Sequence, residues 1–266
     1  MKRRIIIALL LIVAAAFIGR QMQGTKSVSE RGGGRSETRE SFRLEPGASV
    51  EVRGINGSLE ITTTETDTAD VHIVGTAGSR EELDGQKVIV EHTPSSLLVR
   101  TENSGNWWSW FRGGGARQRV SLALPRSIEL TARGVNGPVK VGEVDGSVEM
   151  AGINGRVEVS QVSGHSAFHG NNGNVSVGVG LLDGQGLEVH GNNGVVEIRV
   201  PDGLNADVDV EGLNGSVALN IPGVTMQERQ SRSSMRARLG SGGAPVNIRG
   251  VNGSVRFESI APAVVR

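Results

Sequence analysis

Short runs in which apolar and polar residues alternate recur along much of the chain. Val139-Lys140-Val141, Val157-Glu158-Val159 and Val196-Glu197-Ile198 are examples, in which two aliphatic residues flank one variable residue. Because successive side chains of a β-strand point to opposite faces, this period predicts strands with one buried face and one exposed face. The chain is therefore expected to be all-β.

A Gly-x-Asn-Gly motif precedes these alternating runs. Its asparagines are Asn56, Asn136, Asn154, Asn172, Asn193, Asn214 and Asn252. Five of the motifs begin at residues 134, 152, 170, 191 and 212, at steps of 18 or 21 residues. A second turn, such as Asp145-Gly146 or Asp183-Gly184, lies about midway between them. Each period therefore contains two short strands and two tight turns, which is typical of a repeat architecture.

Two architectures produce such a pattern. Asn-Gly between alternating strands is typical of hairpins, so an antiparallel meander is one of them. The other is a β-solenoid, a parallel β-helix-like coil in which two short strands per period fold their apolar faces together. The two unlike turns in each period favour the solenoid, with coils of 18–21 residues. The step from Gly212 to Gly250, 38 residues, corresponds to about two coils with an irregular segment inside.

The solenoid gives the repeated asparagines a structural role. Equivalent residues of neighbouring coils lie one strand spacing apart, about 4.8 Å. Asparagine amides form hydrogen-bonded ladders at that spacing, and both Asn and Gly tolerate the positive φ of tight turns. We therefore expect the motif asparagines to form a turn ladder along one edge of the solenoid.

The chain divides into five parts. Residues 1–20 carry a basic flank and an apolar run, which indicates a signal peptide or a signal anchor. Residues 21–40 are polar and rich in Gly and Ser, and are predicted to be a flexible linker. Residues 41–131 are predicted to be an irregular β-rich part that caps the solenoid of residues 132–260. Residues 261–266 form a tail.

The N-terminal segment also predicts the location of the protein. A basic flank stays on the cytoplasmic side while the chain that follows is exported. We expect a periplasmic or cell-surface protein. If the segment is not cleaved, residues 5–19 anchor it in the inner membrane.

Composition narrows the chemistry. Lys plus Arg and Asp plus Glu number 28 each, so no excess charge favours nucleic acid as a partner. The chain has 39 Gly but no Cys and no Tyr. This composition suits short strands and tight turns better than an enzyme with a deep aromatic pocket. No cofactor is expected.

A cluster of aromatic residues is the first candidate binding site. It comprises Trp107, Trp108, Trp110 and Phe111, flanked by glycines. Exposed aromatic clusters bind sugar rings, protein partners or membrane interfaces. The alternative is that the cluster folds back over the open end of the solenoid. The basic run Arg229, Arg232, Arg236 and Arg238, in a Ser-rich stretch, is expected to be a mobile loop.

Two histidines form a candidate transition-metal site. Counted along the repeat, His169 and His190 precede the Gly-x-Asn-Gly turns of consecutive coils, and Glu211 comes next in that column. Neutral imidazoles on adjacent strands are suitable metal ligands. The alternative is a set of polar residues on an exposed edge. The aspartates of the second turns are interpreted as turn formers, because Ser163 interrupts the series that a calcium site would need.

Several segments together resemble a known family. They include residues 55–61, Val120-Ser121-Leu122-Ala123-Leu124-Pro125, the run from Gly134 to Val177, and the late segments 239–243 and 247–253. The combination is similar to the bacterial putative-adhesin β-strand-repeat family, catalogued as domain of unknown function 4097. The resemblance implies a solenoid-like β architecture, an exported or membrane-anchored setting and no established enzymatic activity.

The sequence thus predicts a non-catalytic scaffold or binding protein of the cell envelope, not an enzyme. Its expected partner is an unidentified protein or glycan. One alternative is a polysaccharide-acting enzyme on a β-helix, which would need a carboxylate cluster on one sheet face. Another is an envelope sensor or regulatory partner of a membrane protein.

Overall fold

The computed structural model describes residues 26–30, 33–103, 115–228 and 233–260. The predicted signal segment, the aromatic cluster and the tail lie outside these ranges. The described chain is almost entirely β-structure, with 22 strands and one six-residue helix, α2 (Arg80–Gly85). The all-β prediction is confirmed.

The strands form two sheets of eleven strands each. In spatial order, sheet A contains β1 (Lys26–Glu30), β2 (Gly33–Arg43), β5 (Thr68–Ala77), β8 (Arg117–Pro125), β4 (Gly57–Thr64), β10 (Val139–Val144), β12 (Val157–Ser163), β14 (Val175–Leu181), β16 (Val196–Val200), β22 (Val255–Ser259) and β18 (Val217–Asn220). Sheet B contains β19 (Val224–Glu228), β20 (Met235–Leu239), β17 (Ala206–Glu211), β21 (Ala244–Arg249), β15 (Leu187–His190), β13 (Ser166–His169), β11 (Val148–Ala151), β9 (Ile128–Arg133), β3 (Ala48–Arg53), β7 (Ser96–Asn103) and β6 (Gln86–Thr93).

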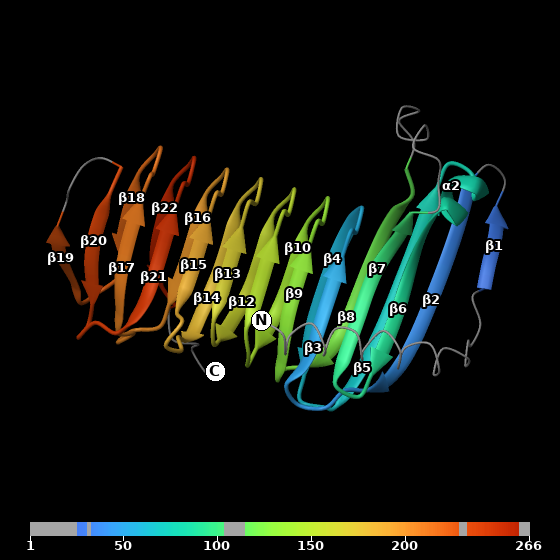
Figure 1. Cartoon of the computed structure of the whole chain (residues 1–266), viewed down its shortest axis with the longest axis horizontal. Helices are drawn as coiled ribbons and strands as arrows, with labels where there is room; N and C mark the ends of the chain where they lie inside the picture. The colour runs from blue at the N-terminus through green and yellow to red at the C-terminus, as the bar shows by residue number, and fades with distance from the viewer. Residues whose placement is uncertain (1–25, 31–32, 104–114, 229–232, 261–266) are drawn as a thin grey trace, which may run out of the picture.

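From β9 to β18 the chain alternates between the two sheets, and the pairs that these strands form with one another are all parallel, with a register shift only between β12 and β14 (Figure 1). Val139 pairs with Val157, which pairs with Val175, which pairs with Val196. Consecutive strands therefore belong to opposite sheets, as in a coil, and do not pair as hairpins. This pairing is that of a two-sheet solenoid and excludes the meander.

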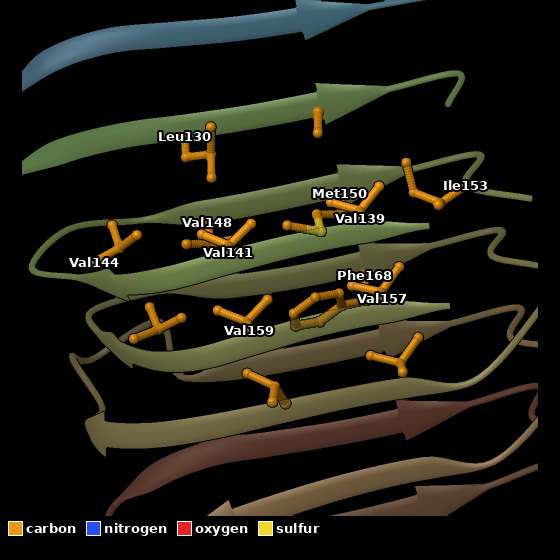
Figure 2. Close-up of a cluster of buried hydrophobic side chains, with 14 of the residues drawn as sticks. Leu130, Val139, Val141, Val144, Val148, Met150, Ile153, Val157, Val159 and Phe168 are labelled. Carbon is orange, nitrogen blue, oxygen red and sulfur yellow. The ribbon is translucent and has the colours of Figure 1, made fainter. Parts of the chain in front are cut away.

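The core lies between the sheets, where the apolar residues of both inner faces meet (Figure 2). Val141 of β10, Met150 of β11 and Phe168 of β13 are fully buried. Since every coil contributes the same pattern, one continuous apolar core runs the length of the stack, as expected for a solenoid.

The seven motif asparagines lie in a single row along one edge. Six of the seven side-chain amides donate a hydrogen bond to the side-chain oxygen of the asparagine in a neighbouring coil, as in Asn172 Nδ2 to Asn154 Oδ1 at 3.1 Å and Asn193 Nδ2 to Asn172 Oδ1 at 3.1 Å. At one end, Asn56 Nδ2 donates to the carbonyl of Ala116 at 3.0 Å. The row therefore joins neighbouring coils through their side chains as well as through the backbone.

The spatial order of the coils differs from their order in the sequence. The last coil, β21 and β22, lies between the coil of β15 and β16 and the coil of β17 and β18. Asn252 accordingly bonds to both Asn193 and Asn214. At the other end, β3 and β4 lie between β7 and β8 on one side and β9 and β10 on the other. The irregular 38-residue step arises because the chain passes outward through β19 and β20 before it returns.

The prediction that residues 21–40 form a flexible linker is wrong for residues 33–40, which belong to strand β2. Strand β2 pairs with β5 in antiparallel register from Gly34 to Arg43. The residues of β2 that face inward, such as Ser36 and Thr38, are mostly polar, so no apolar period marks this strand. Its order comes from pairing with β5 and from contact with α2, which a local pattern does not report.

Candidate functional site

The outer face of sheet A carries a polar depression where β4 and β10 part. These strands pair only from Leu59 to Ile61, and β4 then follows β8 to its end. The depression is lined by residues of β4, β10 and β12 and of the turns beside them. They are Glu60, Ile61, Thr62, Thr63, Thr64, Glu65, Arg126, Lys140, Gly142, Glu143 and Ser160.

Gly142 keeps the depression open. A Cβ atom at this position would lie 2.8 Å from Thr63 Oγ1 and 3.2 Å from the Thr63 backbone nitrogen. The same Thr63 hydroxyl accepts a hydrogen bond from the Glu143 backbone N–H at 3.0 Å. A side chain at residue 142 would therefore fill the floor of the depression. Glycine inside a strand often marks such a close approach, so Gly142 is the local sequence signal that this site offers.

One end of the depression is fixed by an arginine among three carboxylates. Arg126 lies 3.0 Å from Glu65, 2.7 Å from Glu143 and 3.3 Å from Asp145. The hydrogen bond to Glu65 raises the pKa of the Arg126 guanidinium, and Asp145 and Glu143 act in the same direction. The three acids are thus held around a permanent cation and do not face each other across a cleft.

The rest of the lining offers both donors and acceptors to solvent. Glu60, Lys140 and Ser160 are exposed on the outer face of three neighbouring strands. Glu60 and Lys140 are register partners, so a carboxylate and an ammonium lie side by side. This mixture can bind hydroxyl or amide groups, which both donate and accept hydrogen bonds.

The predicted histidine pair lies on the outer face of sheet B. His169 and His190 are register partners, with ring centroids 6.0 Å apart in an edge-on arrangement. Glu211 is not next in this column, contrary to the sequence prediction. The interleaved coil places Arg249 beside His190, and Arg249 Nε lies 3.5 Å from Glu211 Oε2. A guanidinium therefore occupies the position that the prediction gave to a third ligand.

Across the described part of the chain, no group of three His, Cys, Asp or Glu residues is arranged to hold a metal ion. The outer face of sheet B instead carries ion pairs between neighbouring strands. Arg133 lies 2.7 Å from Glu149, and Arg238 lies 2.9 Å from Asp207. Arg236 and Arg238 belong to strand β20, so the predicted mobile basic loop is wrong for these two residues.

The aromatic cluster Trp107, Trp108, Trp110 and Phe111 lies outside the described residues. The strands on either side of it are described: β7 ends at Asn103 and β8 begins at Arg117. Gln118 at the start of β8 accepts a hydrogen bond from the Asn56 backbone N–H at 3.0 Å. The start of β8 therefore lies beside the first asparagine of the ladder.

Two coils differ from the others inside the asparagine edge. Asn171 and Asn192 are each 1% exposed, at the motif position that other coils fill with Ile, Val or Leu. Asn171 Oδ1 accepts from the Ile153 N–H, and Asn192 Nδ2 donates to the Gly194 carbonyl. Asn171 Nδ2 and Asn192 Oδ1 are buried without a hydrogen-bond partner. Such groups lower stability relative to an apolar residue.

Comparison with solved structures finds proteins of similar overall extent. A putative cell adhesion protein from Clostridium sporogenes is 13% identical with a TM-score of 0.37, and the match covers 84% of this chain and 100% of that chain. A putative adhesin from Bacteroides fragilis is 11% identical with a TM-score of 0.30, covering 83% and 96%. A putative lipid binding protein from Parabacteroides distasonis is 10% identical with a TM-score of 0.25, covering 85% and 97%.

Because these sequence identities and TM-scores are low, the comparison assigns neither a ligand nor an activity to this chain. No family model and no curated protein sequence matches it. The resemblance to the adhesin-repeat family therefore stays a prediction. Within the described ranges, no helix has the length and apolar character needed to cross a membrane.

Proposed function

We propose that the protein is a non-catalytic binding scaffold of the cell envelope whose ligand is a glycan. The observation that carries this proposal is the depression on the outer face of sheet A. Its exposed Glu60, Lys140 and Ser160 offer acceptors and donors across three strands spaced about 4.8 Å apart. Sugar hydroxyls both donate and accept, so an extended chain of them matches such a row.

The arrangement of the acids supports binding over hydrolysis. Glycoside hydrolysis needs two carboxyl groups that flank one bond, one of them as a proton donor. Glu65 and Glu143 are instead both within ion-pair distance of Arg126. This arrangement suits a fixed recognition surface.

The test is a glycan array probed with the full-length protein and two variants. Ser160→Trp places an indole in the depression, and Thr131→Trp places the same group on the outer face of sheet B. We expect the wild-type protein and Thr131→Trp to bind the same glycans, and Ser160→Trp to lose them. Absence of glycan binding by the wild-type protein, or equal binding by both variants, contradicts the proposal.

We further propose that the N-terminal segment exports the domain. The support is the basic flank Lys2, Arg3 and Arg4 followed by an apolar run from Ile5 to Ile18. Cell fractionation with an antibody to the repeat domain tests this. The domain is expected in the periplasm, on the surface or with the inner membrane, and recovery in the cytoplasm contradicts export.

A further inference from the structure

The two sheets end at different levels at the C-terminal end of the solenoid. Sheet A ends at β18, which pairs with β22. Sheet B continues past β17, the partner of β18 in the same coil, through β20 to β19. Strands β20 and β19 therefore extend beyond the last strand of sheet A (Figure 1).

Apolar side chains at this end are less covered than in the rest of the stack. Val217 and Leu219 of β18 are half-buried, whereas their register partners on β22, Val255 and Phe257, are 0% exposed. On β19, Met226 is 49% exposed although it pairs with the buried Ala237. The end of the core thus lacks a cover that every internal coil receives from its neighbour.

The edge of β18 also offers free backbone groups. The Ser216 carbonyl accepts a hydrogen bond from the Val255 N–H, on the side of β22. Because backbone groups of a strand alternate in direction, those of Val217 and Leu219 point to the free edge. Among the described residues, no strand pairs with that edge. An exposed, uncharged edge of this kind is a template for pairing with another chain.

The charge pattern separates this end from the other. Residues 212–227 contain no charged residue, although they include both β18 and most of β19. The outermost strand of sheet B at the opposite end carries charges, with Lys87 and Glu91 in β6. Charged edge strands resist pairing, so the C-terminal end is the one suited to association.

Strand directions indicate a second copy of this chain as the occupant. β19 is antiparallel to β20, and β20 is antiparallel to β17, so β19 and β17 run in the same direction. β18 follows β17 through a tight turn into the opposite sheet and therefore runs the opposite way. A two-fold axis parallel to the strands places sheet A of one copy in line with sheet B of the other. It leaves the direction of every strand unchanged. It brings the β18 edge of each copy antiparallel to the β19 edge of the other.

We propose that the protein forms a two-fold symmetric dimer through its C-terminal ends, in which β18 of each copy pairs with β19 of the other. Each contact then occurs twice, as in an isologous interface. The uncharged segment 212–227 meets its own copy without like-charge repulsion. The dimer covers Met226 and the half-buried residues of β18, and it places the two outer depressions on one elongated particle.

Sedimentation equilibrium of the full-length protein is the first test, with two variants on the same strand. Met226→Lys introduces a charge at a residue that is half-exposed in the single copy, and Thr225→Lys introduces it on the outer side of β19. We expect a dimer for the wild-type protein and Thr225→Lys. For Met226→Lys, we expect the dissociation constant to rise more than about 100-fold, because the charge would be buried. Far-ultraviolet circular dichroism checks that both variants remain folded.

Spin-label distances provide the second test, because a chain without cysteine accepts a single introduced thiol. A label at Thr225→Cys is expected to give a distance between copies of a few strand spacings, each about 4.8 Å. A label at Ser41→Cys, on β2 at the opposite end, is expected to give none. A monomeric wild-type protein, a dimer unaffected by Met226→Lys, or a distance between copies from residue 41 would overturn the proposal.

Discussion

The two glycines of the Gly152-Ile153-Asn154-Gly155 turn are expected to be required for different physical reasons. In one coil, Gly152 has φ +64° and its nearest neighbour to an added Cβ is 3.9 Å away. Gly155 lies outside the positive-φ region, but an added Cβ would be 2.3 Å from the Gly137 carbonyl oxygen. In this turn Gly152 is thus required by backbone conformation, and Gly155 by the close approach of the neighbouring coil.

These reasons predict different costs for the same substitution. Gly152→Ala should lower the free energy of unfolding by about 1–2 kcal/mol, the cost of a left-handed conformation for a residue with a Cβ. Gly155→Ala should lower it by more than about 3 kcal/mol, because the contact is with backbone and the coils have to move apart. Urea unfolding followed by circular dichroism measures both, with the slope checked because repeat proteins can depart from two-state behaviour.

Asparagine at the same positions separates the two causes. Asn tolerates positive φ better than Ala, so Gly152→Asn should be less destabilising than Gly152→Ala. Gly155→Asn should be at least as destabilising as Gly155→Ala, because the clash remains. Equal costs for the two alanine variants, or no recovery with asparagine at residue 152, would refute the reasoning.

Further changes test other features. Asn172→Ala removes one donated and one accepted hydrogen bond of the ladder. It should lower the free energy of unfolding in urea by about 1–3 kcal/mol. An unchanged urea midpoint would show that the ladder does not stabilise the fold. A chain that ends at Gly243 lacks β21 and β22, and should lose the cooperative thermal transition, since β15 and β17 each lose one neighbouring strand and the stack is interrupted between them. Arg238 lowers the pKa of Asp207. The stability that this pair contributes is therefore present above the unfolded pKa of Asp207 and is lost as the pH falls through its folded pKa. The difference in urea midpoint between wild type and Asp207→Asn should shrink at acid pH, and a constant difference would exclude the ion pair as its cause. All three Trp residues lie in the aromatic cluster, so strong acrylamide quenching would indicate an exposed binding cluster and weak quenching a buried one.

The coil itself was predictable from the sequence, but the order of the coils was not. Alternation around Val139, Val157 and Val175, together with the spacing of the Asn-Gly turns, specifies strands, turns and a repeat of two strands. The pattern does not specify which coils become neighbours. Val196, for example, pairs with Val175 on one side and with Val255 on the other. The interleaved order depends on the β19–β20 excursion, which sets where the chain returns. That is why the sequence placed Glu211 beside His190 while the structure places Arg249 there.

The candidate site was less predictable than the fold. Gly142 inside a strand signals a close approach, but it does not indicate that Arg126 shares the same surface, because the depression depends on where β4 leaves β10 for β8. Strand β2 was missed for a related reason, since its inward residues are polar and its order comes from pairing with β5. Features set by partners distant in the sequence are not encoded in a local hydrophobic period.

The interleaved C-terminal coil has a consequence for synthesis. The ribosome completes residues 206–220 before residues 244–259, yet the later segment lies between the earlier one and the rest of the stack. While the chain emerges, β17 and β18 either wait unpaired or pair first with β15 and β16 and are later displaced. Either route delays completion of the core until the last residues are available. A chain that crosses a membrane from its N-terminus in an unfolded state meets this requirement, because all of its coils then become available to assemble on the far side.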